Sequence, residues 1–179
     1  MLDSNEATYE PLETPLINKK DYWNNLRKIK VLLNPQGSTR EIPVSELDSL
    51  ISKIDHSEVE FLMTNTKKSE EYFKGLTPKQ NLHLSPKTTL LEYFSLINSA
   101  DIVISVDGGG VHIACSYNKK LLYFYGSDSK NLAKWYPVTT NDFFVVKNNF
   151  YSNDKTYGFD MEKAADWFNH QIKLIINKP

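Results

Sequence analysis

One stretch of the chain decides its fold class, and it reads Ser99-Ala100-Asp101-Ile102-Val103-Ile104-Ser105-Val106-Asp107-Gly108-Gly109-Gly110-Val111-His112-Ile113-Ala114. An apolar run ends in an aspartate, three glycines follow, and a helical pattern begins with a histidine in its first turn. Glycine permits positive φ and lets a ligand approach the backbone, because no Cβ stands in the way. A strand, a tight turn and a helix in this order are typical of one unit of a parallel sheet.

The rest of the chain repeats this alternation of strand and helix. Runs of apolar, often β-branched residues have the composition of strands covered on both faces. The expected strands are residues 29–33, 59–63, 82–84, 102–106, 121–125 and 143–146. Helical spacing of apolar residues predicts helices over 44–54, over 90–97 with a capping box from Thr89 and Glu92, and over 161–175 with Asp160 as N-cap. We therefore expect an α/β fold, a Rossmann-like doubly wound parallel sheet of about six strands.

Length and composition exclude several classes of protein. The 179 residues (20.6 kDa) have the size of one domain, which we expect over residues 28–179 after a polar lead-in segment, residues 1–27. Lys and Arg number 21 against 22 Asp and Glu, so we expect no nucleic-acid partner. No apolar run approaches the ~20 residues of a transmembrane helix, and the start lacks the features of a signal peptide. A single cysteine, Cys115, excludes an internal disulfide and a multi-cysteine zinc site, so we expect a cytoplasmic protein.

The glycine turn has a functional and a structural interpretation. In the functional one, the helix start holds an anion such as a diphosphate, Asp107 positions a hydroxyl or fixes the loop, and His112 donates to a phosphate oxygen. In the structural one, Asp107 merely caps the helix and His112 is half-exposed. The residues alone leave both open. The turn is neither G-x-G-x-x-G nor a Walker A loop, which disfavours dinucleotide and P-loop binding.

The glycine turn and the segment after it resemble glycosyltransferase family 9, which includes the ADP-heptose:lipopolysaccharide heptosyltransferases. Asp107-Gly108-Gly109-Gly110-Val111-His112 keeps the aspartate, second-position glycine and histidine of the family's loop. Gly108 and Gly110 stand where the family has a hydroxyl residue and Pro or Leu. Downstream, Leu121-Leu122-Tyr123-Phe124-Tyr125-Gly126-Ser127-Asp128 and Trp135-Tyr136-Pro137 are similar to the family's closing strand and loop.

Two upstream residues are assigned through the same resemblance, which covers residues 28–178 in order. Arg40 comes after the first strand, three residues before Pro43, where the family has a phosphate-facing lysine. A guanidinium binds a diphosphate bidentately, so the exchange keeps the charge and changes the geometry. Glu70 comes after the second strand, near the family's acidic residue that holds the ribose hydroxyls of the sugar nucleotide.

The resemblance implies the C-terminal half of a GT-B glycosyltransferase, which grips the sugar nucleotide. Its diphosphate would rest on the amides of Gly108, Gly109, Gly110 and Val111, with Arg40 and His112 donating hydrogen bonds. Help to the transition state would be electrostatic, through stabilisation of the departing nucleotide diphosphate. An ADP-heptose-like sugar nucleotide is the implied substrate, with no cofactor and no metal. The implied acceptor is lipopolysaccharide or another surface glycan, at the inner face of the bacterial inner membrane.

The acceptor-binding half of such an enzyme has no counterpart in this sequence. Only about 28 residues precede the first expected strand, too few for a second domain of about 100 residues. The family's general base, an aspartate of the N-terminal domain, is therefore missing, and the catalytic residues are unknown. Three explanations are open: a fragment, a subunit of a split enzyme completed by a second chain, or a domain that no longer catalyses. The corresponding alternative function is a non-catalytic sugar-nucleotide-binding module.

A few other residues carry chemistry of their own. We interpret His83 as structural and Cys115 as an inert buried thiol. Trp135 and Tyr136 either border a sugar or base pocket or serve in packing. A third class, an epimerase-like nucleotide enzyme, would need a Tyr-x-x-x-Lys motif. The only instance, Tyr151-Ser152-Asn153-Asp154-Lys155, falls in a polar loop, which disfavours it.

Overall fold

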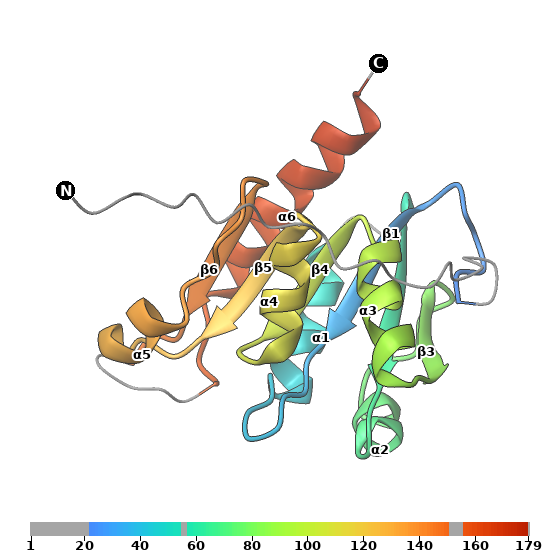
Figure 1. Ribbon diagram of the computed structural model, residues 1–179. Helices are drawn as coiled ribbons and strands as arrows, with labels where there is room; N and C mark the ends of the chain where they lie inside the picture. Colours follow the sequence, from blue (N-terminus) through green and yellow to red (C-terminus); the bar gives the residue numbers. More distant parts are fainter. Residues whose placement is uncertain (1–21, 55–56, 151–155, 179) are drawn as a thin grey trace.

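A computed structural model describes residues 22–54, 57–150 and 156–178, in which strands and helices alternate throughout (Figure 1). The strands are β1 (Ile29–Asn34), β2 (Val59–Asn65), β3 (Leu82–Lys87), β4 (Ile102–Val106), β5 (Lys120–Tyr125) and β6 (Phe143–Lys147). The helices are α1 (Val44–Lys53), α2 (Ser69–Lys74), α3 (Leu90–Ser99), α4 (Gly109–Ser116), α5 (Ser129–Lys134) and α6 (Met161–Ile176).

The six strands form one sheet in the order β3-β2-β1-β4-β5-β6, and every neighbouring pair is parallel. The expected doubly wound sheet is therefore confirmed. All six strands lie where the apolar runs predict them. β3 is the exception in length, because it continues past residue 84 to Lys87 and includes Pro86. A proline, which has no N–H to donate, is tolerated there because β3 is an edge strand.

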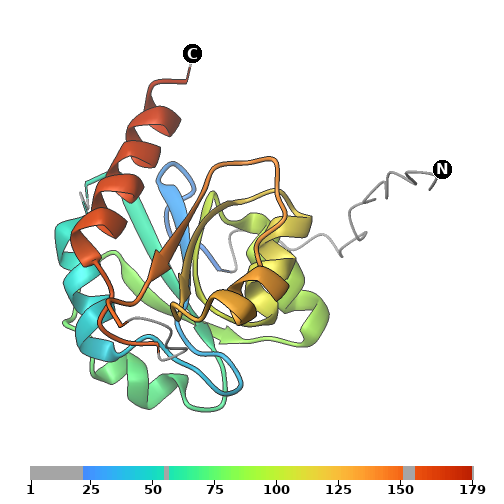
Figure 2. The same ribbon diagram turned by 90° about the vertical axis from the view of Figure 1, so that its left-hand side faces the viewer.

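Helices cover both faces of the sheet, so the core has two layers (Figure 2). On one face, α1 and α6 pack against each other and bury an apolar cluster that includes Leu50, Phe61 and Phe168. On the other face, α3 and α4 pack together over a cluster that includes Leu32, Leu96 and Tyr123. Burial on both faces explains why the central strands are continuous apolar runs and do not alternate polar and apolar residues.

The helix starts agree with the capping signals of the sequence. Thr89 and Glu92 form the expected capping box, in which the N–H of Glu92 donates to Thr89 Oγ1 (3.3 Å) and the N–H of Thr89 donates to Glu92 Oε2 (2.7 Å). Asp160 accepts from the N–H of Lys163 at 3.1 Å and caps α6 as expected. The sequence did not predict α2 and α5, because helices of six residues are too short to display a helical period.

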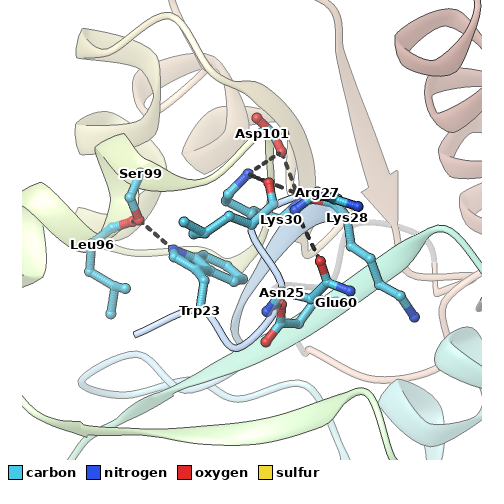
Figure 3. Close-up of polar contacts among 10 residues, drawn as sticks. Trp23, Asn25, Arg27, Lys28, Lys30, Glu60, Leu96, Ser99 and Asp101 are labelled. Carbon is cyan, nitrogen blue, oxygen red and sulfur yellow. Dashed lines mark hydrogen bonds and ion pairs between the residues drawn. The ribbon is translucent and has the colours of Figure 1, made fainter. Parts of the chain in front are cut away.

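The segment just before β1 is attached to the amino ends of the strands (Figure 3). Trp23 is only 1% exposed, and its indole N–H donates to Ser99 Oγ at 2.8 Å. The N–H groups of Asn24 and Asn25 both donate to the carboxylate of Glu60 at 2.7 Å. The described end of the lead-in segment is thus part of the packed structure. Within the described residues, no helix is long and apolar enough to cross a membrane.

Candidate functional site

The residues singled out by the sequence lie at the carboxyl ends of the strands. β1 and β4 are neighbours in the sheet, and the chain turns outward from them in opposite directions, to β2 and β3 on one side and to β5 and β6 on the other. Open α/β sheets bind ligands at this reversal of strand order, beyond the carboxyl ends. Arg40 comes after β1 and Asp107 after β4, so both loops border that position.

An ion pair joins these two loops. The guanidinium of Arg40 donates from Nη1 to Oδ2 of Asp107, and the hydroxyl of Tyr123 donates to Oδ1 of the same carboxylate at 2.9 Å. The side chain of Asp107 is 11% exposed and that of Arg40 is 25% exposed. The sequence predicts both residues in the site but not their pairing, nor the part of Tyr123. Asp107 does not cap the helix, because the N-cap of α4 is Gly108 and no side-chain cap bond is present; its carboxylate instead connects the loops after β1 and β4 with β5.

Aromatic rings of β5 lie beneath this ion pair. The guanidinium carbon of Arg40 is 5.6 Å from the centre of the Tyr125 ring, and the Tyr123 and Tyr125 rings meet edge to face at 5.4 Å. Burial raises the pKa of both phenols, and the neighbouring carboxylate of Asp107 raises them further. Both therefore remain protonated at neutral pH. Sequence reasoning missed the two tyrosines because they looked like core residues; the signal was two phenols two positions apart in an otherwise apolar strand.

Glycines let the two loops approach each other backbone to backbone. A Cβ on Gly37 would lie 2.9 Å from the carbonyl oxygen of Asp107, closer than side chains come. Gly108 has φ +156°, a conformation that residues with a side chain rarely adopt. Gly109 is exposed and has open space where a Cβ would stand. The turn thus leaves the first residue of α4 accessible.

Gly110, the next residue of the turn, is packed closely against the interior. A Cβ on Gly110 would lie 2.2 Å from Asn34 Nδ2 and 2.7 Å from the hydroxyl of Tyr93, so only glycine fits. Asn34 itself donates to Ser105 Oγ (3.0 Å) and accepts from Thr64 Oγ1 (3.1 Å). This buried network holds the start of α4 against the ends of β1 and β4.

The backbone of the turn is partly engaged within itself. The N–H of Val111 donates to the carbonyl oxygen of Gly108 at 3.1 Å, and the Val111 side chain is fully buried. Because the first N–H groups of a helix have no partner inside it, Gly109 and Gly110 supply the remaining amides of the first turn. A ligand that uses the amide of Val111 would have to replace its bond to Gly108.

His112 faces solvent and points toward a different set of residues. Its ring lies 5.9 Å from that of Trp135, whose other neighbour is the ammonium of Lys134, 5.2 Å from the ring centre. The ion pair between Arg40 and Asp107 is completed by Tyr123 and not by His112. Trp135 and Tyr136 are about half exposed, and the ring of Tyr136 packs edge to face on Phe143.

Glu70 is exposed and lies on α2, beside and not within the hollow at Arg40. That hollow measures about 530 Å³ and is lined by the loop after β1 (Gln36, Gly37, Ser38, Thr39, Arg40, Glu41) and the one after β2 (Thr66, Lys67, Lys68). Glu70 borders an adjoining hollow that shares only the β2 loop. The structure therefore brings Arg40, Asp107 and the glycine turn together, and leaves Glu70 and His112 on either side.

The remaining candidates are consistent with structural roles or lie outside the described residues. Cys115 is half-buried, and burial raises the pKa of its thiol, which disfavours the reactive thiolate. His83 lies on β3 near the amino edge of the sheet, among Glu60 and Asn81. The Tyr151–Lys155 motif lies outside the described residues. Within the part of the chain that is described, no three His, Cys, Asp or Glu side chains are grouped to hold a metal ion.

Comparison with known families shows which family the chain belongs to. The profile of glycosyltransferase family 9 (heptosyltransferase) matches residues 27–165, which is most of the chain. The chain belongs to glycosyltransferase family 9. No curated protein matches it significantly.

Solved structures show the same fold at low sequence identity. Heptosyltransferase II of E. coli, an ADP-heptose lipopolysaccharide enzyme, matches with a TM-score of 0.68 and 15% identity over 85% of this chain and 49% of its own. E. coli heptosyltransferase WaaC with ADP matches with a TM-score of 0.68 and 15% identity over 80% of this chain and 44% of its own. UDP-GlcNAc 2-epimerase from Neisseria meningitidis, bound to UDP-GlcNAc, matches less well (TM-score 0.56, 17% identity, 85% of this chain, 38% of its own). This family 9 chain therefore spans about half the length of the heptosyltransferases whose fold it shares.

Proposed function

We propose that this chain is the half of a family 9 glycosyltransferase that binds the sugar nucleotide. One observation carries the proposal: Arg40 and Asp107 meet at the reversal of strand order, beside a glycine turn that opens a helix. A guanidinium, a carboxylate and first-turn amides suit a ligand that combines phosphates with sugar hydroxyls. The E. coli structure with ADP supports an adenosine diphosphate sugar such as ADP-heptose as the first ligand to test.

In this proposal Arg40 supplies charge to the departing diphosphate. The phosphate oxygens take the place of the Asp107 carboxylate on the guanidinium, and Asp107, still held by Tyr123, turns its freed oxygen to a ligand hydroxyl. The exposed His112 donates to a phosphate oxygen from the α4 side, and Glu70 approaches the ribose from α2. Positive groups that are fixed before reaction stabilise a developing negative charge without further reorganisation.

The transfer step needs residues from another polypeptide segment. We propose that an acceptor-binding domain, which would contribute the general base, faces the carboxyl edge of this sheet. The acceptor is then lipopolysaccharide or another surface glycan, and the complex works at the inner face of the bacterial inner membrane. The competing proposal, a sugar-nucleotide-binding module without catalysis, shares the same ligand site.

A titration of the ¹⁵N-labelled chain with an ADP-sugar tests the binding proposal. We expect the amide signals of Gly108, Gly109 and His112 to move, while those of Asn24 and Asn25 at the opposite edge stay unchanged. Stationary glycine-turn signals at millimolar ligand would refute the site. A transfer assay with and without candidate partner chains then separates the two roles, since sugar transfer by any combination rules out the binding-only module.

A further inference from the structure

Two tyrosines on β5 have the same surroundings but different hydrogen bonding. Tyr123 and Tyr125 point to the same face of the sheet, because side chains two positions apart in a strand do. Both are at most 1% exposed, and their rings are in edge-to-face contact. The hydroxyl of Tyr123 donates to Asp107. The hydroxyl of Tyr125 is buried, and among the described residues its proton has no acceptor; the nearby guanidinium of Arg40, which partly offsets the effect of burial on the pKa of this phenol, can only donate.

A buried hydroxyl whose proton has no acceptor is unusual enough to need an explanation. Buried polar side-chain atoms nearly always have a partner, and one without a partner destabilises the folded state. Phenylalanine would fill the same volume without this penalty. The chain therefore keeps a polar group here against its own stability, a pattern that is expected where a ligand completes the hydrogen bonding.

The position of Tyr125 indicates which kind of ligand group would accept the hydrogen bond from its hydroxyl. The guanidinium of Arg40 lies over its ring, 5.6 Å from the centre, and pairs with Asp107 beside it. An anion that draws Arg40 away from Asp107 uncovers the phenol at the same time. The bound anion then lies next to the guanidinium of Arg40 and the neutral hydroxyl of Tyr125, whose proton has no other acceptor.

We propose that the hydroxyl of Tyr125 donates a hydrogen bond to the terminal phosphate of a nucleoside diphosphate held by Arg40. This proposal rests on the sugar-nucleotide site described above and adds a residue that determines specificity for the diphosphate. Burial keeps the phenol protonated, because it raises the pKa of Tyr125 above its ordinary value. Tyr123, which is already engaged with Asp107, serves as its internal control.

The test compares Tyr125→Phe and Tyr123→Phe by calorimetric titration with ADP and with AMP. We expect Tyr125→Phe to weaken ADP binding about tenfold, as loss of a hydrogen bond to a charged group does, and to affect AMP binding much less. Its melting temperature should equal or exceed that of the unmodified chain. Tyr123→Phe should instead lower the melting temperature, because Asp107 loses a buried donor.

The outcomes separate this proposal from the proposed function. If the unmodified chain binds ADP and Tyr125→Phe binds it equally well, the role of Tyr125 is wrong and the sugar-nucleotide site stands. If the unmodified chain binds neither nucleotide, the site itself is wrong. Should Tyr125→Phe fail to fold, tyrosine ¹³Cζ labelling of the unmodified chain decides: the Tyr125 signal shifts upon saturation with ADP, and an unmoved signal overturns the proposal.

Discussion

Arg40 and Asp107 are 67 residues apart in the sequence and form an ion pair between the loops after β1 and β4. The pair lies where the strand order reverses. In the free chain, the two charged groups that could bind a ligand therefore neutralise each other. A ligand must compete with this internal contact. The affinity for the ligand therefore depends on how much more strongly the guanidinium of Arg40 binds a phosphate than it binds the carboxylate of Asp107.

Replacement of Arg40 separates its role in binding from its role in folding. We expect Arg40→Ala to weaken ADP binding at least tenfold, since a phosphate loses its cation. Stability should fall by only about 0–1 kcal/mol, because a partly exposed ion pair contributes little. Arg40→Lys keeps the charge but loses the bidentate geometry, so its ADP affinity should lie between those of the unmodified chain and Arg40→Ala. Calorimetric titration and thermal melts check this; unchanged ADP affinity in Arg40→Ala would contradict it.

Two neighbouring glycines should respond oppositely to the same substitution. Gly110→Ala places a methyl group against Asn34 and Tyr93, and we expect a loss of about 1–3 kcal/mol, the usual range for overpacking. Gly109→Ala, where the space is open, is the matched control and should be neutral or slightly stabilising. Urea denaturation measures both. Equal losses in the two variants would show that space at Gly110 is not the cause.

Removal of Trp23 tests whether the segment before β1 belongs to the folded unit. Trp23→Ala deletes a fully buried indole, and we expect a loss of about 3–5 kcal/mol. Trp23→Phe keeps most of the apolar contact but leaves Ser99 Oγ without its donor, so a loss of about 1 kcal/mol is expected. Chemical denaturation gives both values. Leu26→Ala, at an exposed position nearby, is the control and should change little.

Alkaline pH should destabilise the fold through its buried phenols. Burial raises the pKa of Tyr93 to about 12, above the ordinary value of 10, so the unfolded chain loses this proton first. The contribution of Tyr93 is complete below pH 10 and is lost as the pH rises from 10 through 12. Denaturation curves between about pH 8 and 12 should show a weaker pH dependence in Tyr93→Phe than in the unmodified chain. Identical slopes would contradict the assignment.

The fold could be predicted well because the signals that specify it are local. Central strands such as β4 are covered on both faces, and the continuous apolar runs that this requires are visible in the sequence. The capping box at Thr89 is likewise a pattern of four consecutive residues. Short helices such as α2 were missed because six residues cannot show a period, and β3 was predicted too short because the apolar run ends at Leu84.

The candidate site was predicted by its residues but not by its contacts. The resemblance supplied Arg40 and Asp107 separately, since each lies in its own motif, and their pairing depends on β1 lying next to β4. Tyr123 and Tyr125 could not be distinguished from core residues, because a buried phenol differs from phenylalanine only by the partner of its hydroxyl. The close packing at Gly110 also depends on residues far away in the sequence, Asn34 and Tyr93.

The contact between His112 and Trp135 has a practical consequence for spectroscopy. The chain has three tryptophans, and their environments differ. Trp23 is sealed in the interior and Trp167 is stacked on Phe144, whereas Trp135 is 46% exposed and adjoins the glycine-turn helix through His112. Iodide should therefore quench emission from Trp135 selectively. Intrinsic fluorescence thus offers two separate signals: quencher access to Trp135 reports occupancy near α4, and the emission of the buried Trp23 reports global unfolding.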